Sequence, residues 1–181
     1  MRLRLTAGVV AAVAFLMTAT PARADNGRSA EVRTVELRDR CDPATFNAVL
    51  GNGACVPHKD ARVTLDELLE KLNPVDFGHD GWRNNPDKTE IRKGDSLKVT
   101  VRGGEAHSFT EVASFGPGCV DDLNLPLGLG PGPGPEVCGP LFATLIPAGA
   151  NVTIANLSPG THRFMCIIHP WMKTTVDVRN S

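Results

Sequence analysis

The chain has no long apolar run and no strong charge of either sign. Its longest apolar stretch, residues 5–17, is shorter than the roughly 20 residues that a helix needs to span a bilayer. The formal net charge is −1, and it becomes −4 once residues 1–24, with three arginines and no acidic residue, are set aside. We therefore expect no stable membrane insertion, and neither nucleic acid nor an anionic membrane as a partner.

Residues 1–24 have the organisation of a secretory signal peptide. Arg2 and Arg4 precede the apolar run, and residues 22–24 form an A-x-A cleavage pattern. The sequence has no cysteine at the cleavage point, as a lipoprotein would have, and no twin-arginine pair. The pattern predicts export by a Sec-type route, cleavage after Ala24, and a periplasmic or secreted protein.

Five cysteines in an exported chain leave one without a partner. Four cysteines allow three connectivities, and short closure distance favours bridges between Cys41 and Cys55 and between Cys119 and Cys138. Each bridge would stabilise the fold by roughly 3 kcal/mol. Cys166 then remains as a free thiol, which is a liability in an oxidising compartment unless a metal holds it.

The sequence predicts an all-β fold after residue 85. Alternation of Leu97, Val99 and Val101 with polar residues is typical of a half-buried strand. Further strands are expected over residues 107–112, 142–146, 151–157, 161–166 and 174–178, with a long Pro/Gly loop at 116–140 closed by the second disulfide. Many short strands separated by turn residues indicate an antiparallel sandwich or barrel.

The residues before this domain are expected to form an extension over residues 25–85. The composition of residues 25–40 predicts weak order. Thr64 and Glu67 form a capping box, which predicts a short helix over residues 65–72 that ends before Asn73-Pro74. Helix is expected only in this extension, and the domain itself is expected to cover residues 86–181.

A C-x2-H-x2-M motif near the C-terminus carries the clearest chemical signal. It places the thiol of Cys166, the imidazole of His169 and the thioether of Met172 directly after a predicted strand. A thiolate and a thioether combined with imidazole suit copper, whereas zinc rarely uses methionine. Such a site needs one more ligand, normally a second histidine.

His107 is the best candidate for that ligand among the five histidines. His162 shares a strand with Cys166 but lies roughly 13 Å along it, so it is read as a core or edge histidine. His58 and His79 belong to the extension and are read as surface or capping residues. His107 begins a strand after a Gly-Gly turn, where its side chain can point inward.

These residues resemble the cupredoxins, or type 1 blue-copper proteins, over roughly residues 86–181. His107 matches the histidine of an early strand, and residues 160–166 with His169 and Met172 match the late strand and ligand loop. The short spacing, with Pro170 after the histidine, is most similar to amicyanin. Residues 41–181 also resemble bacterial plastocyanin-like proteins that carry an N-terminal extension.

The resemblance implies a Greek-key antiparallel β-sandwich, cupredoxin-like, with one type 1 copper ion. His107, Cys166 and His169 would form the ligand plane, and Met172 would be a weak axial ligand. His169 would offer the more exposed edge. Pro170 and Trp171 could form an apolar docking patch, although a tryptophan that covers the core is an equal interpretation for Trp171.

One local departure concerns Ser108, which stands where many relatives have asparagine after the first histidine. The hydrogen bonding that steadies the Cys166 loop is therefore expected to differ from theirs.

The expected function is one-electron transport between Cu(I) and Cu(II) by a monomer that meets a redox protein partner. The alternative is copper storage, delivery or resistance, but such sites are often methionine-rich, and only Met165 and Met172 remain after residue 24. Multicopper oxidases and nitrite reductases need further histidine clusters, typically H-x-H pairs. No H-x-H occurs in the chain, so no enzyme is expected.

Overall fold

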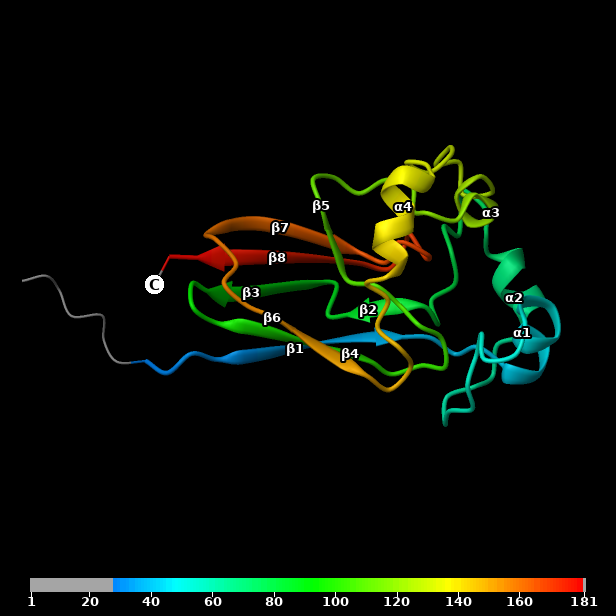
Figure 1. Cartoon of the computed structure of the whole chain (residues 1–181), viewed down its shortest axis with the longest axis horizontal. Coiled ribbons are helices and arrows are strands. Elements are labelled where there is room, and N and C mark those ends of the chain that lie inside the picture. Colours follow the sequence, from blue (N-terminus) through cyan, green and yellow to red (C-terminus); the bar gives the residue numbers. More distant parts are fainter. Residues whose placement is uncertain (1–27, 181) are drawn as a thin grey trace, which may run out of the picture.

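The computed structural model describes residues 28–180, and they form a sandwich of two four-stranded sheets (Figure 1). The predicted signal peptide lies outside the described residues. The first sheet has the order β2-β1-β4-β6, with the strands Val32–Arg38 (β1), Arg83–Asn85 (β2), Ser96–Val101 (β4) and Asn151–Ile154 (β6). The second has the order β3-β8-β7-β5, with the strands Lys88–Arg92 (β3), Thr110–Val112 (β5), Gly160–Met165 (β7) and Lys173–Arg179 (β8).

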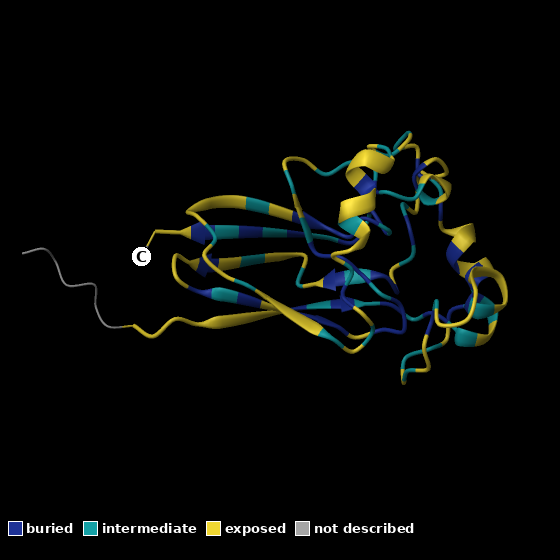
Figure 2. Cartoon of the chain, viewed as in Figure 1, coloured by how far each residue is buried: buried dark blue, intermediate teal, exposed yellow. Residues whose placement is uncertain are grey.

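Alternating apolar side chains from both sheets fill the space between them. Leu97, Val99 and Val101 on β4 are each at most 1% exposed, as the alternation predicts. Val176 and Val178 on β8 face the same core from the other sheet. Figure 2 shows buried segments on strands of both sheets. The predicted all-β sandwich is confirmed. Each sheet is mixed rather than wholly antiparallel, because β1 pairs with β4, and β3 with β8, in parallel.

Within residues 28–180, four short helices rather than one join the strands. They are Pro43–Leu50 (α1), Leu65–Glu70 (α2), Asp121–Asn124 (α3) and Pro135–Phe142 (α4), and in Figure 1 they lie toward the end of the sandwich away from the C-terminus. The predicted helix at residues 65–72 is confirmed as α2, with its capping box, though α2 ends two residues earlier. No helix among residues 28–180 combines the length and apolar character needed to cross a membrane.

The expectation that helix stays within the extension was wrong, and so was the strand predicted over residues 142–146. Pro135 occupies the first turn of α4, where its fixed φ favours a helix and its missing N–H costs no hydrogen bond. Phe142 is the last residue of that helix, and Ile146 pairs only through an isolated bridge to His107.

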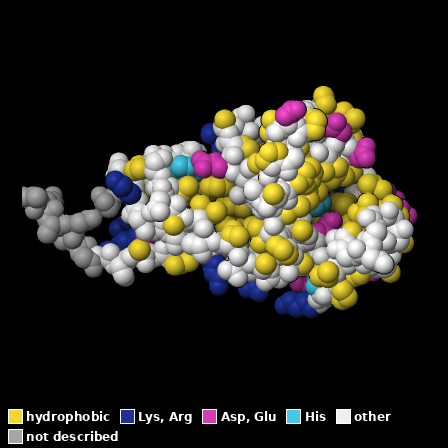
Figure 3. Space-filling model, viewed as in Figure 1, with side chains coloured by type: hydrophobic (Ala, Val, Ile, Leu, Met, Phe, Trp, Pro, Cys, Tyr) yellow, Lys and Arg dark blue, Asp and Glu magenta, His cyan; other side chains and the backbone are white. Residues whose placement is uncertain are grey.

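On the face drawn in Figure 3, apolar side chains gather near α4 and β6, and Phe142 and Val152 are 40% and 37% exposed.

The expectation of weak order over residues 25–40 was also wrong for residues 32–38, whereas residues 25–27 lie outside the described residues. β1 pairs with β4 from Val32 to Leu37, and Val35 and Leu37 are fully buried. The sandwich therefore takes β1 and β2 from the residues assigned to the extension. The boundary between the extension and the domain at residues 85 and 86 remains a prediction from the sequence.

A buried carboxylate in the turn between β3 and β4 makes stability depend on pH. Asp95 accepts hydrogen bonds from the N–H groups of Glu31 and Arg92, each at 2.9 Å, and pairs with Arg28. These bonds lower the pKa of Asp95 from 3.8 to about 2. A lowered folded-state pKa stabilises the fold above the unfolded value, and that contribution disappears as pH falls from about 4 through 2.

We expect Asp95→Asn to flatten the pH dependence of the free energy of unfolding between about pH 4 and pH 2. Urea denaturation at several pH values measures it. Glu70→Gln, at an exposed position on α2, is the matched control and should keep the wild-type pH profile. An unchanged profile in Asp95→Asn would show that other carboxylates dominate this range.

Candidate metal centre

Three of the predicted ligands lie on a loop and a strand end that backbone hydrogen bonds hold in place. Cys166 directly follows β7, and His169 and Met172 lie in the connection to β8. The N–H of Cys166 donates to the carbonyl of Met172 at 3.0 Å, and the N–H of Met172 donates to the carbonyl of His169 at 2.9 Å. His107 lies between β4 and β5 and exchanges two backbone hydrogen bonds with Ile146. The loop therefore brings its ligand residues to one end of the sandwich.

The structure brings His107, Cys166 and His169 together as donors around one point. The Nδ1 atoms of His107 and His169 each lie 3.8 Å from Sγ of Cys166. One metal with bonds of about 2.3 Å to sulfur and about 2.0 Å to nitrogen, at trigonal angles, needs a sulfur–nitrogen separation of about 3.7 Å. All three residues are at most 2% exposed, so the donor set fits a buried metal ion. Met172 is fully buried in the same loop, and its axial role stays a prediction.

Ser108 supplies the hydrogen bonds that steady the Cys166 loop. Its backbone N–H points at Sγ of Cys166 at 3.5 Å, and its hydroxyl accepts from the N–H of Ile167 at 2.9 Å. Thr110 donates its hydroxyl to the same oxygen at 3.0 Å. Ser108 and Thr110 therefore link the segment after His107 to the loop that holds Cys166 and His169, without the asparagine that many relatives have.

The environment of Cys166 favours the thiolate. Complete burial alone would raise the pKa of its thiol, but hydrogen bonding and charge from His107 and His169 hold it well below its ordinary value. The thiolate is the form of cysteine that binds metals.

Both predicted disulfides are present, and Cys166 is a free, buried cysteine. Cys41 is bonded to Cys55, and Cys119 is bonded to Cys138. The first bridge lies close to His58, but its sulfurs are bonded to each other and offer no thiolate to a metal.

The remaining histidines lie outside the donor cluster, but His58 is not the surface residue that was expected, because its side chain is 11% exposed and its Nε2 lies 3.8 Å from Oδ1 of Asp39. His162 lies on β7, with Nδ1 2.6 Å from Glu111 and Nε2 2.8 Å from the carbonyl of Ser158. Nδ1 of His79 accepts the N–H of Gly81 in a turn. Nδ1 of His58 lies 3.1 Å from the carbonyl of Val56.

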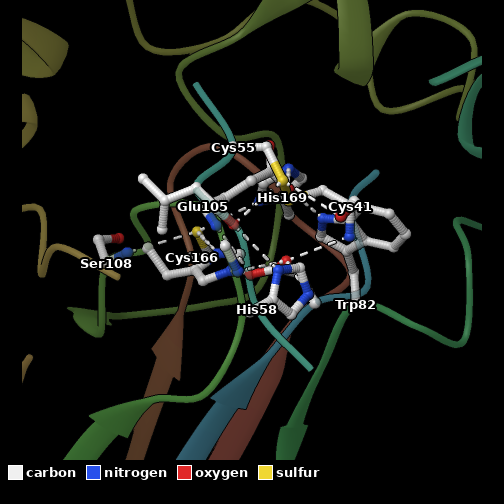
Figure 4. A network of polar contacts seen from close by, with 12 residues as sticks. Cys41, Cys55, His58, Trp82, Glu105, Ser108, Cys166 and His169 are labelled. Carbon is white, nitrogen blue, oxygen red and sulfur yellow. Dashed lines mark hydrogen bonds and ion pairs between the residues drawn. A yellow bond between two sulfur atoms is a disulfide. The ribbon is translucent and has the colours of Figure 1, made fainter. Parts of the chain in front are cut away.

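The expectation that His169 offers an exposed edge was wrong, because it is 2% exposed. Figure 4 shows Trp82 and Glu105 beside it, and the ring centroid of Trp82 lies 6.4 Å from that of His169. Trp82 is 1% exposed and stacks on Phe46 of α1 at 5.8 Å, so residues assigned to the extension cover the site. Trp171 meets His169 edge-on at 5.3 Å.

The predicted docking patch of Pro170 and Trp171 is largely covered as well. Pro170 is buried, and Trp171 is only partly exposed. The indole of Trp171 packs on Gly78, where an added Cβ would lie 2.4 Å from the ring and where φ is +101°. Trp171 therefore matches the interpretation of a covering aromatic.

Two buried carboxylates behind the histidines were missed by the sequence analysis. Oδ2 of Asp39 lies 2.8 Å from Nε2 of His107, and Oε2 of Glu105 lies 3.7 Å from Nε2 of His169. Burial would lower the pKa of His107, but its contacts with Asp39 and Cys166 raise it to about 10. Burial raises the pKa of Glu105, which accepts the indole N–H of Trp82. Neither carboxylate lies in a ligand motif, so no local pattern marks it.

No protein-family model matches the chain, and no curated protein matches its sequence. Among solved structures, oxidised plastocyanin from the fern Dryopteris crassirhizoma is 16% identical over 81% of this chain and 99% of its own, with a TM-score of 0.39. A mutant of amicyanin in the Cu(I) form is 17% identical over 54% of this chain and 73% of its own, with a TM-score of 0.35. A copper-containing nitrite reductase from Thermus scotoductus is 21% identical over 56% of this chain and 21% of its own, with a TM-score of 0.36.

These structures are a plastocyanin, an amicyanin and a nitrite reductase, so they do not decide whether this chain is an enzyme. Their identities and TM-scores are low, and they carry no argument about the site. The candidate type 1 copper site rests on its own donors: His107, Cys166 and His169 in one buried cluster, with Met172 in the same loop.

Proposed function

We propose that this protein is a one-electron carrier that holds a single type 1 copper ion. His107, Cys166 and His169 would bind it directly, and Met172 would be the weak axial ligand. The observation that carries the proposal is the pair of Nδ1 atoms, each 3.8 Å from one buried cysteine sulfur. Hard cations would not select a thiolate with two imidazoles, whereas copper does.

Bound copper would supply a one-electron couple between Cu(I) and Cu(II). The chain keeps the donors in place for both states through the closed loop at Cys166 and Met172 and through the Ser108 hydrogen bonds. Because these contacts belong to a packed sandwich, little rearrangement would accompany electron transfer.

Electron transport fits better than catalysis because the described residues offer no separate second centre. The other metal-capable groups within residues 28–180 are the bridged Cys41 and Cys55 with His58, and a carboxylate group that shares His107. The burial of the donors also weighs against storage or delivery, since copper that is handed over needs an open site. We further propose an exported monomer that exchanges electrons with a redox protein partner.

The visible and EPR spectra of the protein loaded with one equivalent of Cu(II) test the proposal. We expect an intense thiolate-to-copper band and one copper ion per chain, and the zinc-loaded protein should be colourless as a control. A colourless protein that holds stoichiometric Cu(II) would contradict the proposal. Rapid loss of copper to a chelator would instead favour storage or delivery.

A further inference from the structure

Asp39 lies behind the candidate copper site with its carboxylate fully enclosed. It follows β1, and its side chain is 0% exposed. Its two oxygens accept the N–H groups of Gly104 at 2.9 Å, Glu105 at 3.2 Å and Cys41 at 3.3 Å, and Oδ2 lies 2.8 Å from Nε2 of His107. A buried carboxylate that accepts three backbone N–H groups is held in its charged form.

The chain places Asp39 there through the parallel pairing of β1 with β4. The N–H of Arg102 donates to the carbonyl of Leu37 at 2.7 Å, so the ends of both strands stay together. Gly103 then passes so close to the carboxylate that an added Cβ would lie 1.7 Å from Oδ2 of Asp39. Glycine is required for that close approach.

The two ring nitrogens of His107 face different partners. Nδ1 faces Sγ of Cys166 at 3.8 Å, and Nε2 faces Oδ2 of Asp39 at 2.8 Å. A histidine can bind a metal through Nδ1 only when its proton is on Nε2, and a carboxylate at Nε2 holds the proton there. The same carboxylate makes the imidazole a stronger donor and places a buried negative charge near the metal, which favours the more highly charged ion.

We propose that Asp39 is a positioning residue that fixes the metal-binding tautomer of His107 and lowers the reduction potential of the copper. The inference rests on the proposed function and deepens it, because it assigns control of the reduction potential to Asp39, a residue outside the C-x2-H-x2-M motif. Asparagine at this position would remove the charge and turn an amide N–H₂ toward one of the present donors.

The test compares Asp39→Asn with Glu36→Gln. Glu36 lies on β1, three residues before Asp39, and its carboxylate pairs with Arg38 and Arg102 rather than with a ligand, so its variant removes an equal charge. We expect Asp39→Asn to favour Cu(I) by at least tenfold, which is an upward shift of about 59 mV for a one-electron couple. Cu(II) affinity should fall about 10–100-fold, and Glu36→Gln should change neither quantity by more than about threefold.

NMR of the wild-type protein loaded with Cu(I) gives a second test that does not depend on the folding of a variant. We expect His107 to carry a slowly exchanging proton on Nε2 and none on Nδ1. A proton on Nδ1, or rapid exchange at Nε2, would overturn the proposal, as would a blue Asp39→Asn variant with the wild-type potential. If the wild-type protein itself has no thiolate-to-copper band, the proposed function fails, and this outcome is distinct from the other two.

Discussion

Replacement of Cys166 by serine is expected to abolish the thiolate-to-copper absorption band. Cys166 is the free cysteine of the chain, and its sulfur lies 3.8 Å from both histidine nitrogens. Serine has nearly the same shape but offers a hard oxygen of high pKa, so it supplies neither the thiolate nor its charge transfer to copper. The loss should be complete rather than graded.

The matched control is the double variant Cys119→Ser, Cys138→Ser, which leaves no new thiol. Its bridge joins the segment before α3 to Cys138 in α4, and the backbone N–H of Cys119 donates to the carbonyl of Ile167, next to Cys166. We expect the band to remain, while the free energy of unfolding falls by about 2–5 kcal/mol. Visible spectra per bound copper and urea denaturation measure the two effects. Loss of the band in the control but not in Cys166→Ser would show that the cysteine assignment is wrong.

The candidate ligands were predictable because their signals are local. Cys166, His169 and Met172 lie within seven residues, and the period-two pattern around them places the motif after a strand. The disulfides were predictable for a similar reason, since their cysteines are separated by 14 and 19 residues. His107 required elimination among five histidines, and strand length was enough to exclude His162.

The surroundings of the site were not predictable because they depend on pairing between distant segments. Asp39 reaches His107 across 68 residues, and Trp82 reaches Glu105 across 23. The first contact follows from the position of β1 beside β4, and the second also needs β2 beside β1. β1 itself has only a short apolar alternation. A single sequence marks which residues can bind a metal, but not which residues fold over them. For that reason the exposure of His169 was predicted wrongly.

Trp82→Ala is expected to lower the free energy of unfolding strongly. Trp82 is 1% exposed, stacks on Phe46 with 15° between the rings, and donates its indole N–H to Glu105. Truncation of a buried tryptophan costs about 3–5 kcal/mol, which is a large part of the 5–15 kcal/mol that holds a typical domain together. It would also leave Glu105 without a hydrogen-bond donor in a buried position.

The same substitution should open the site, because Trp82 separates His169 from solvent on the side of α1. We expect the copper-loaded variant to be reduced faster by a small inorganic reductant in stopped-flow measurements, while urea denaturation reports the stability loss. Trp82→Phe is the matched control: it keeps an aromatic cover but removes the N–H, so its reduction rate should stay near that of the wild type. If Trp82→Ala unfolds more easily and is reduced no faster, Trp82 supports the fold without screening His169, and electrons would enter beside Trp171 instead.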